Sequence, residues 1–250
     1  MRTTAFWAFK RRLAYGTLFA FILICCFTWV YFAYFYQAPN CFDGEQNNDE
    51  AAIDCGGGCV RICPFEAVEP SVKWARSFKV TDGLYNAVAY VENLNRVAAT
   101  PELAYTFSLY DEAGIITEVS GITILPPNSV YPVFAPRIAT GNRVPTRTFL
   151  ELSPADLWVP STLGSEQFTA TDRELADADE KPRLRATIRN NDLEEAEDVE
   201  IVATIFDANK NALTSSRTFV ENFAPRSERE SCLYSKSQLL KLSAVVCRLT

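Results

Sequence analysis

The chain of 250 residues contains no histidine. This absence excludes histidine-containing catalytic triads, histidine-ligated zinc and histidine general bases. Catalysis by carboxylates, thiols or lysine stays open, but no arrangement of such residues marks a site. The acids Asp198 and Glu200 alternate along an expected strand, on the face that we expect to be solvated. We therefore expect a protein that is not an enzyme.

Acidic residues are absent from the first 37 positions, which hold Arg2, Lys10, Arg11 and Arg12. The rest of the chain has 20 basic and 31 acidic residues, a formal charge of −11. Nucleic-acid binding requires cations that displace counterions from phosphate. We therefore expect no nucleic-acid partner for this acidic body.

Charge is also absent from Leu13 to Tyr36, a run of 24 residues. At a rise of about 1.5 Å per residue, a helix of this length crosses a hydrocarbon core of roughly 30 Å. The basic residues before it indicate a cytoplasmic N-terminus. A cleaved signal peptide would have a shorter apolar run that ends at small residues, and Ile24 fits poorly before a lipidated cysteine. We expect residues 1–12 in the cytoplasm and residues 13–36 as a single-pass anchor in the cell membrane.

Four cysteines, Cys41, Cys55, Cys59 and Cys63, follow within residues 37–66. On the exported side of a membrane thiols are oxidised, so we expect two disulfides that staple a small module. Three pairings are open. The oxygen-bearing side chains of the same loop suggest calcium, which takes six to eight oxygen ligands. These candidate ligands are Asp43, Asn47, Asp49, Glu50 and Asp54. The alternative is that they satisfy backbone groups of turns.

Ten positions between Cys41 and Cys59 resemble a short cysteine module with a D-C-G-G-x-C pattern, found after the anchor of exported bacterial proteins. They are Cys41, Asp43, Gly44, Asn47, Glu50, Asp54, Cys55, Gly56, Gly57 and Cys59. The resemblance covers under a tenth of the chain and implies a bacterial envelope protein.

From about Ser71 onward, short runs alternate between apolar and polar residues, as in Arg183–Arg189 and Val199–Ile205. This period of two is typical of half-buried antiparallel strands. The segment around Phe107–Asp111 repeats near Ala203–Asp207 at an offset of 96 residues. We therefore expect two β-sandwiches, at residues 67–159 and 182–250, joined by a linker at residues 160–181.

The string at Phe107, Leu109, Tyr110 and Asp111 resembles FxLYD-type immunoglobulin-like domains of bacterial envelope proteins. The resemblance implies tandem immunoglobulin-like sandwiches. From the residues alone, Phe107 and Leu109 should face the core, and Asp111 and Asp207 should cap turns rather than bind a ligand.

The last 25 residues depart from the repeat and could form a helix or an irregular edge strand. They contain Cys232 and Cys247, which could form a third disulfide outside the cytoplasm.

The expected fold is thus mainly β, with an N-terminal transmembrane helix, a disulfide-stapled module and two tandem sandwiches. The expected function is non-enzymatic: a membrane-anchored envelope protein that displays its sandwiches outside the cytoplasm, for binding a protein partner or as a spacer. The alternative is a structural subunit of an envelope assembly, such as a secretion or surface-filament complex. No cofactor is expected apart from the calcium hypothesis.

Overall fold

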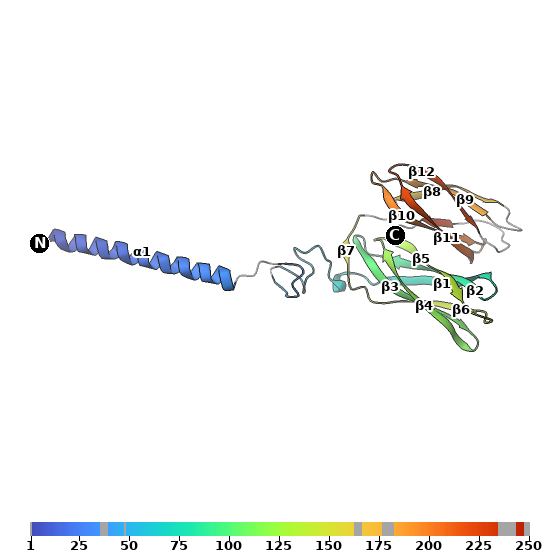
Figure 1. The fold of residues 1–250 in the computed structure, drawn as a ribbon, viewed down its shortest axis with the longest axis horizontal. Helices are drawn as coiled ribbons and strands as arrows, with labels where there is room; N and C mark the ends of the chain where they lie inside the picture. The colour runs from blue at the N-terminus through green and yellow to red at the C-terminus, as the bar shows by residue number, and fades with distance from the viewer. Residues whose placement is uncertain are drawn as a thin grey trace.

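The computed structural model describes residues 2–35, 40–47, 49–162, 167–176, 183–234 and 244–247. At residues 2–6, 8, 183, 231–234 and 244–247 it describes only the backbone. The fold is mainly β, with one apolar N-terminal helix and several antiparallel sheets (Figure 1). After the helix, the regular elements of the described residues are one short 3₁₀ turn, η1 (Pro64–Glu66), and then strands.

Helix α1 (Arg2–Tyr34) extends away from the β-structure, with the small cysteine module between them (Figure 1). Its stretch Phe9–Tyr34 is long and apolar enough to cross a membrane. Apolar side chains surround this stretch on all sides, and none of it is buried against the rest of the described protein. A helix that is apolar all round requires an apolar environment. The helix therefore fits a single-pass anchor.

The first sandwich consists of two antiparallel sheets, with strand orders β1-β2-β5 and β4-β3-β6. Its strands are β1 (Ser71–Thr81), β2 (Leu84–Asn93), β3 (Ala98–Asp111), β4 (Gly114–Leu125), β5 (Ser129–Ala139) and β6 (Arg147–Leu152). The short strand β7 (Val159–Pro160) pairs with the start of β3. Phe107 and Leu109 are fully buried between the sheets with Leu103 and Val133. The core-facing prediction for Phe107 and Leu109 is confirmed.

The second sandwich repeats this order, with sheets β8-β9-β12 and β11-β10-β13. Its strands are β8 (Phe168–Ala176), β9 (Arg183–Asn190), β10 (Ala196–Phe206), β11 (Ala212–Phe223), β12 (Glu228–Tyr234) and β13 (Ala244–Cys247). The two alternating runs found in the sequence fall in β9 and β10. The described part of the chain's end, β13, pairs with β10 at the position that β6 takes beside β3.

Strand β8 corrects the linker prediction for residues 160–181, because nine of these residues form a strand that pairs with β9. Phe168 is buried in the second core against Phe223, with ring centroids 5.6 Å apart. The alternation is interrupted by a register shift between Thr171 and Glu174, and most side chains of β8 are exposed. An edge strand tolerates such polar residues, which explains why its sequence looks like a solvated connection.

A buried asparagine ends the second strand of each sandwich and confirms the internal repeat. The side-chain amide of Asn93 donates to the carbonyl of Pro126 at 2.9 Å. Asn190 donates to the carbonyl of Phe223 at 3.2 Å, so both members of the pair are shifted by the same 97 positions. Each asparagine also accepts, at 3.0 Å, the N–H of the residue two positions later. Each thereby joins the second-to-third strand turn to the end of the fourth strand.

The two sandwiches pack against each other through the outer faces of sheets β1-β2-β5 and β11-β10-β13 (Figure 1). Trp74 stacks on Tyr90 with ring centroids 4.7 Å apart, and Phe206 meets the Trp74 ring edge-on at 6.0 Å. Val202 of β10 is fully buried in the same cluster. Strand β2 is therefore covered on both faces, by its own core and by the second sandwich.

The contact between the sandwiches also corrects the expectation that Glu200 is solvated. Its side chain is 2% exposed and accepts a hydrogen bond from Arg217 at 3.0 Å. The Arg217 guanidinium lies 5.3 Å from the centre of the Phe134 ring, on the other sandwich. The alternation correctly placed Glu200 away from the core of its own sandwich, but that face is covered by a neighbour rather than by water.

Candidate functional site

The cysteine module is closed by two disulfides, Cys41–Cys59 and Cys55–Cys63, with Cα separations of 5.7 and 5.1 Å. These bonds confirm the expected disulfides and select one of the three pairings left open. The first and third cysteines are joined, as are the second and fourth, so the two closed loops overlap. A segment too short to form a core is thereby held together covalently.

The predicted third disulfide involves Cys232 and Cys247, whose side chains lie outside the described part of the structure. Their backbones belong to β12 and β13, in different sheets of the second sandwich. This disulfide stays a prediction.

Gly57 allows the module to fold tightly around its acidic loop. Its φ of +58° lies in the left-handed region, and a Cβ at this position would lie 1.9 Å from the carbonyl oxygen of Asp49. No side chain fits at this distance, so the position requires glycine.

The candidate calcium ligands of the module accept hydrogen bonds from backbone groups. Asp54 accepts the N–H groups of Asp43 and Gly44, at 3.0 and 3.1 Å for the closest oxygens. Glu50 accepts the N–H groups of Asn47 and Asp54, both at 3.3 Å. These contacts match the alternative interpretation, in which the side chains satisfy turns.

A second observation bears on a metal in the module. Among the described residues, one group of three potential ligand atoms comes from Cys41, Glu50 and Cys59. These three atoms lie within 4.8 Å of one another. The two sulfurs are bonded to each other, so they cannot act as thiolate ligands. The carboxylate of Asp49 lies beside Gly58. Calcium binding by Asp43, Asn47, Asp49, Glu50 and Asp54 stays a prediction.

The module is fixed to the end of the first sandwich by hydrogen bonds from backbone and side-chain groups. The N–H of Ile62 donates to the carbonyl of Trp158 at 2.9 Å. The Asn95 side chain accepts from the N–H of Val68 at 2.8 Å and donates to its carbonyl at 2.7 Å. Cys63 and Trp158 are buried at this junction. The module therefore continues into the sandwich as a packed unit.

The aspartates of the two related turns act as caps, as predicted. Asp111 accepts the N–H of Ala113 at 2.8 Å, and Asp207 accepts the N–H of Asn209 at 2.8 Å. Arg143 forms an ion pair with Asp111 and, with the backbone N–H groups of the turn, lowers the pKa of that carboxyl. The Asn211 side chain and the turn N–H groups lower the pKa of Asp207. Both carboxylates thus stabilise turns.

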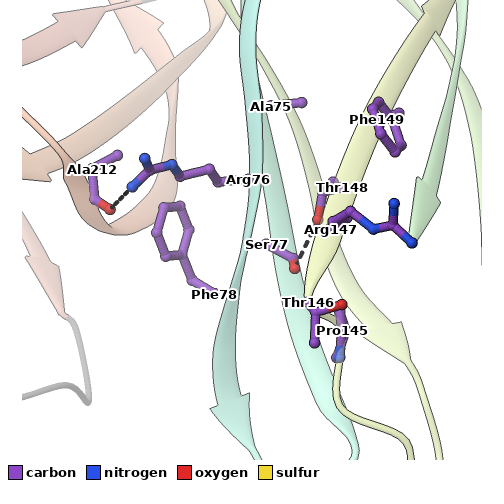
Figure 2. A pocket seen from close by; sticks show the side chains of 10 residues that line it. All are labelled: Ala75, Arg76, Ser77, Phe78, Pro145, Thr146, Arg147, Thr148, Phe149 and Ala212. Atoms are coloured by element: carbon purple, nitrogen blue, oxygen red, sulfur yellow. Dashed lines mark hydrogen bonds between the residues drawn. The ribbon is translucent and has the colours of Figure 1, made fainter. Parts of the chain in front are cut away.

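A pocket of about 520 Å³ lies beside the first sandwich (Figure 2), and no sequence pattern predicted it. We call it the edge groove. It is lined by residues 75–78 of β1, residues 145–149 at the start of β6, and Ala212 of β11. Side chains alternate between the two faces of a sheet, so consecutive residues line a pocket only at the edge of a strand. The edge groove therefore follows the edges of β1 and β6.

These two strands are the edges of opposite sheets. Within the described residues, β1 pairs only with β2, and β6 pairs only with β3. The hydroxyl of Thr148 donates to that of Ser77 at 2.9 Å and joins the two edges (Figure 2). The edges of β1 and β6 therefore lie close together, and neither pairs with a further strand of the described structure.

The lining of the edge groove contains two arginines and no acidic residue, in a body with a formal charge of −11. Arg76 donates to the carbonyl of Ala212 at 3.2 Å, across the boundary between the sandwiches. Arg147 and Phe149 lie on the opposite side of the groove in Figure 2. The groove therefore combines strand edges, apolar surface and positive charge.

No protein-family model matches the chain, and a search of curated proteins finds no match. The D-C-G-G-x-C and FxLYD patterns accordingly stay resemblances, and the functional argument rests on the geometry.

Proposed function

We propose that this chain is a non-enzymatic bacterial envelope protein that displays its paired sandwiches outside the cytoplasm and binds a protein partner there. The observation that carries the proposal is the sequence of parts along the chain. An apolar helix is followed by a module with two disulfides, and this module is hydrogen-bonded to the end of the first sandwich. Such an arrangement joins a membrane anchor to a folded body through a covalently closed module.

The basic residues Lys10, Arg11 and Arg12 support an orientation with the N-terminus in the cytoplasm of a cell-membrane protein. The disulfides support the same orientation, because they persist in oxidising compartments and are rare in the cytosol. The body then lies outside the cytoplasm, where partner proteins and other envelope components are accessible to it.

The strand order supports an immunoglobulin-like assignment for both sandwiches. The first, second and fifth strands share one sheet, and the third and sixth are neighbours in the other. Immunoglobulin domains distribute strands A, B and E, and strands C and F, in this way. Domains of this architecture present binding surfaces on loops and edges, and no shared activity follows from the fold alone.

Topology is tested by protease treatment of intact cells that express the chain with a tag at each end. We expect the C-terminal tag to be lost from intact cells, or after outer layers are permeabilised, while the N-terminal tag is retained until the cell membrane is opened. Thiol alkylation with and without reductant gives a second readout: Cys41, Cys55, Cys59 and Cys63 should react only after reduction. A protected C-terminal tag, with these four thiols reactive from the start, would refute the proposal.

The alternative function, a structural subunit of an envelope assembly, is supported by the same strand edges at the edge groove, because edges can pair with neighbouring subunits. Mild crosslinking before extraction from the membrane separates the two. A displayed binding protein should be recovered mostly alone, whereas an assembly subunit should be recovered in a complex of fixed composition.

A further inference from the structure

We infer that the edge groove binds an extended acidic segment of a partner protein, which adds a strand to the free edge of β6. This inference rests on the proposed function and deepens it, because it assigns the site and the chemistry of the partner. It is built on the backbone of β6, on the groove beside it and on the charge of the groove lining.

The backbone of β6 offers, at regular positions, hydrogen-bonding groups that pair with no other strand among the described residues. In an antiparallel ladder, alternate residues direct both their N–H and C=O groups towards the same neighbouring strand. The N–H of Ser153 donates to the carbonyl of Ala104, in the same register that pairs Phe149 with Ser108. Phe149 and Glu151 are therefore directed towards β3, and Thr148 and Leu150 are directed towards the free edge. Their outward groups are those that an added strand would pair with.

The edge groove has space and contacts for such a strand. Its volume of about 520 Å³ lies beside residues 147–149 of β6 and residues 75–78 of β1. An added strand would direct alternate side chains towards β1, where Ala75 and Ser77 are small. The other side chains would lie beside Phe149, which is 55% exposed and offers apolar contact. The geometry favours an extended segment with small residues on one face and apolar residues on the other.

The positive charge of the groove lining favours an acidic segment. Arg147 lies two residues before Phe149, so both side chains point to the same face of β6. The structure gives Arg147 no hydrogen bond or ion pair with any described residue, and no carboxylate lines the groove. A carboxylate opposite Arg147 would form a cross-strand pair, whereas a cation there would be repelled. The preferred occupant therefore carries an acidic residue next to its apolar ones.

The test uses the full chain in detergent micelles and the palindromic peptide T-V-T-E-T-V-T as probe. Its valines and glutamate lie on one face of an extended strand, and its pattern reads the same in either direction. We expect saturable binding by fluorescence anisotropy, and slower hydrogen exchange at the amides of Thr148 and Leu150. A peptide with lysine in place of glutamate should bind more weakly, and one with N-methylated alternate amides should not bind.

Two pairs of variants separate backbone pairing from charge. Thr148→Pro removes an outward N–H and should abolish binding, whereas Thr148→Val loses the bond to Ser77 but keeps the N–H and should bind. Arg147→Glu should weaken the glutamate peptide by about tenfold and strengthen the lysine peptide. Arg96→Glu makes the same charge change in the β2–β3 loop and should leave both affinities unchanged. Circular dichroism checks that each variant is folded.

The inference is refuted if folded Thr148→Pro and Arg147→Glu bind both peptides like the parent, or if no peptide protects the β6 amides. It is also refuted if the chain self-associates in sedimentation experiments and Thr148→Pro abolishes the association, since a second copy is then the occupant. These results do not depend on membrane orientation, so failure of the groove and failure of the proposed topology are distinguished.

Discussion

At the scale of single residues, the buried asparagines add side-chain hydrogen bonds between turns and strand ends. Asn93 is 1% exposed, and its amide donates to the carbonyls of Ala98 and Pro126, both at 2.9 Å. Asn93→Ala removes the side-chain donor to the Ala98 carbonyl and one of two side-chain donors to the Pro126 carbonyl, which also accepts from Ser129. A buried acceptor left unsatisfied costs about 1–3 kcal/mol before relaxation. We expect a loss of about 2–4 kcal/mol in the free energy of unfolding, measured by urea denaturation.

The matched control for this change is Asn209→Ala. Asn209 is exposed in the β10–β11 turn, and only its backbone N–H takes part in a hydrogen bond given by the structure. Its substitution should change the free energy of unfolding by less than about 0.5 kcal/mol. Equal effects at the two positions would show that the buried amide bonds contribute no particular stability.

Also at the residue scale, Asp111 and Asp207 should make stability depend on acid pH. Arg143 lowers the pKa of Asp111, and Asn211 lowers that of Asp207. A carboxyl whose pKa is lower in the folded chain stabilises it above the unfolded pKa of about 3.9. This stability is lost as the pH falls through the lower, folded pKa.

The double variant Asp111→Asn and Asp207→Asn keeps oxygens that can accept the turn N–H groups but removes both titrating carboxyls. We expect its urea midpoint to lie below that of the parent at pH 7. The two midpoints should converge as the pH falls from about 4 through the folded pKa values. A difference that stays constant down to pH 2 would contradict the assigned pKa directions.

At the scale of elements, strand β8 is tested by Phe168→Ala. Phe168 is 8% exposed and packs on Phe223 in the second core. Truncation should cost about 3–5 kcal/mol, through lost burial and a cavity. The control Glu174→Ala changes an exposed side chain of the same strand and should be nearly neutral. A neutral Phe168→Ala would restore the original expectation that these residues form a linker.

The elements also show what local sequence patterns can predict. The alternation in Arg183–Arg189 and Val199–Ile205 was enough for β9 and β10, because each of these strands has a regular core-facing side. Strand β8 escaped prediction because its pattern breaks at a register shift and most of its side chains are exposed. The cysteines predicted a stapled module, but their pairing depends on how the intervening turns fold, which spacing does not determine.

At the scale of the whole molecule, the contact between the sandwiches and the edge groove arise where elements distant in sequence meet. A signal for the contact was present in Ala87–Val91, an apolar run without alternation, because a strand buried on both faces has this composition. Glu200 indicated the opposite, because a charged residue on the face away from the core normally lies in solvent. The groove had no local signal, because it depends on the placement of two edges in opposite sheets and a turn of the other sandwich.

The packed sandwiches should unfold together, because the cluster of Trp74, Tyr90, Phe206 and Val202 links their stabilities. We expect one calorimetric transition for the β-structure of the parent chain. Trp74→Ala removes the ring that contacts both Tyr90 and Phe206. It should lower stability by about 3–5 kcal/mol and separate the transition into two, one for each sandwich.

The ion pair beside this cluster allows a sharper test of the same contact. Removing Arg217 breaks the ion pair of the Glu200 carboxylate, which is 2% exposed, and breaking a buried ion pair typically costs about 3–5 kcal/mol. Replacing both residues by methionine fills similar volume without burying a charge, so the double variant should recover most of the loss from Arg217→Met. The free energies of unfolding of the two single variants and the double variant form a thermodynamic cycle. Additive losses in this cycle would mean that the two side chains do not interact. In the calorimetric experiment, two transitions already present in the parent chain would mean that the sandwiches unfold independently.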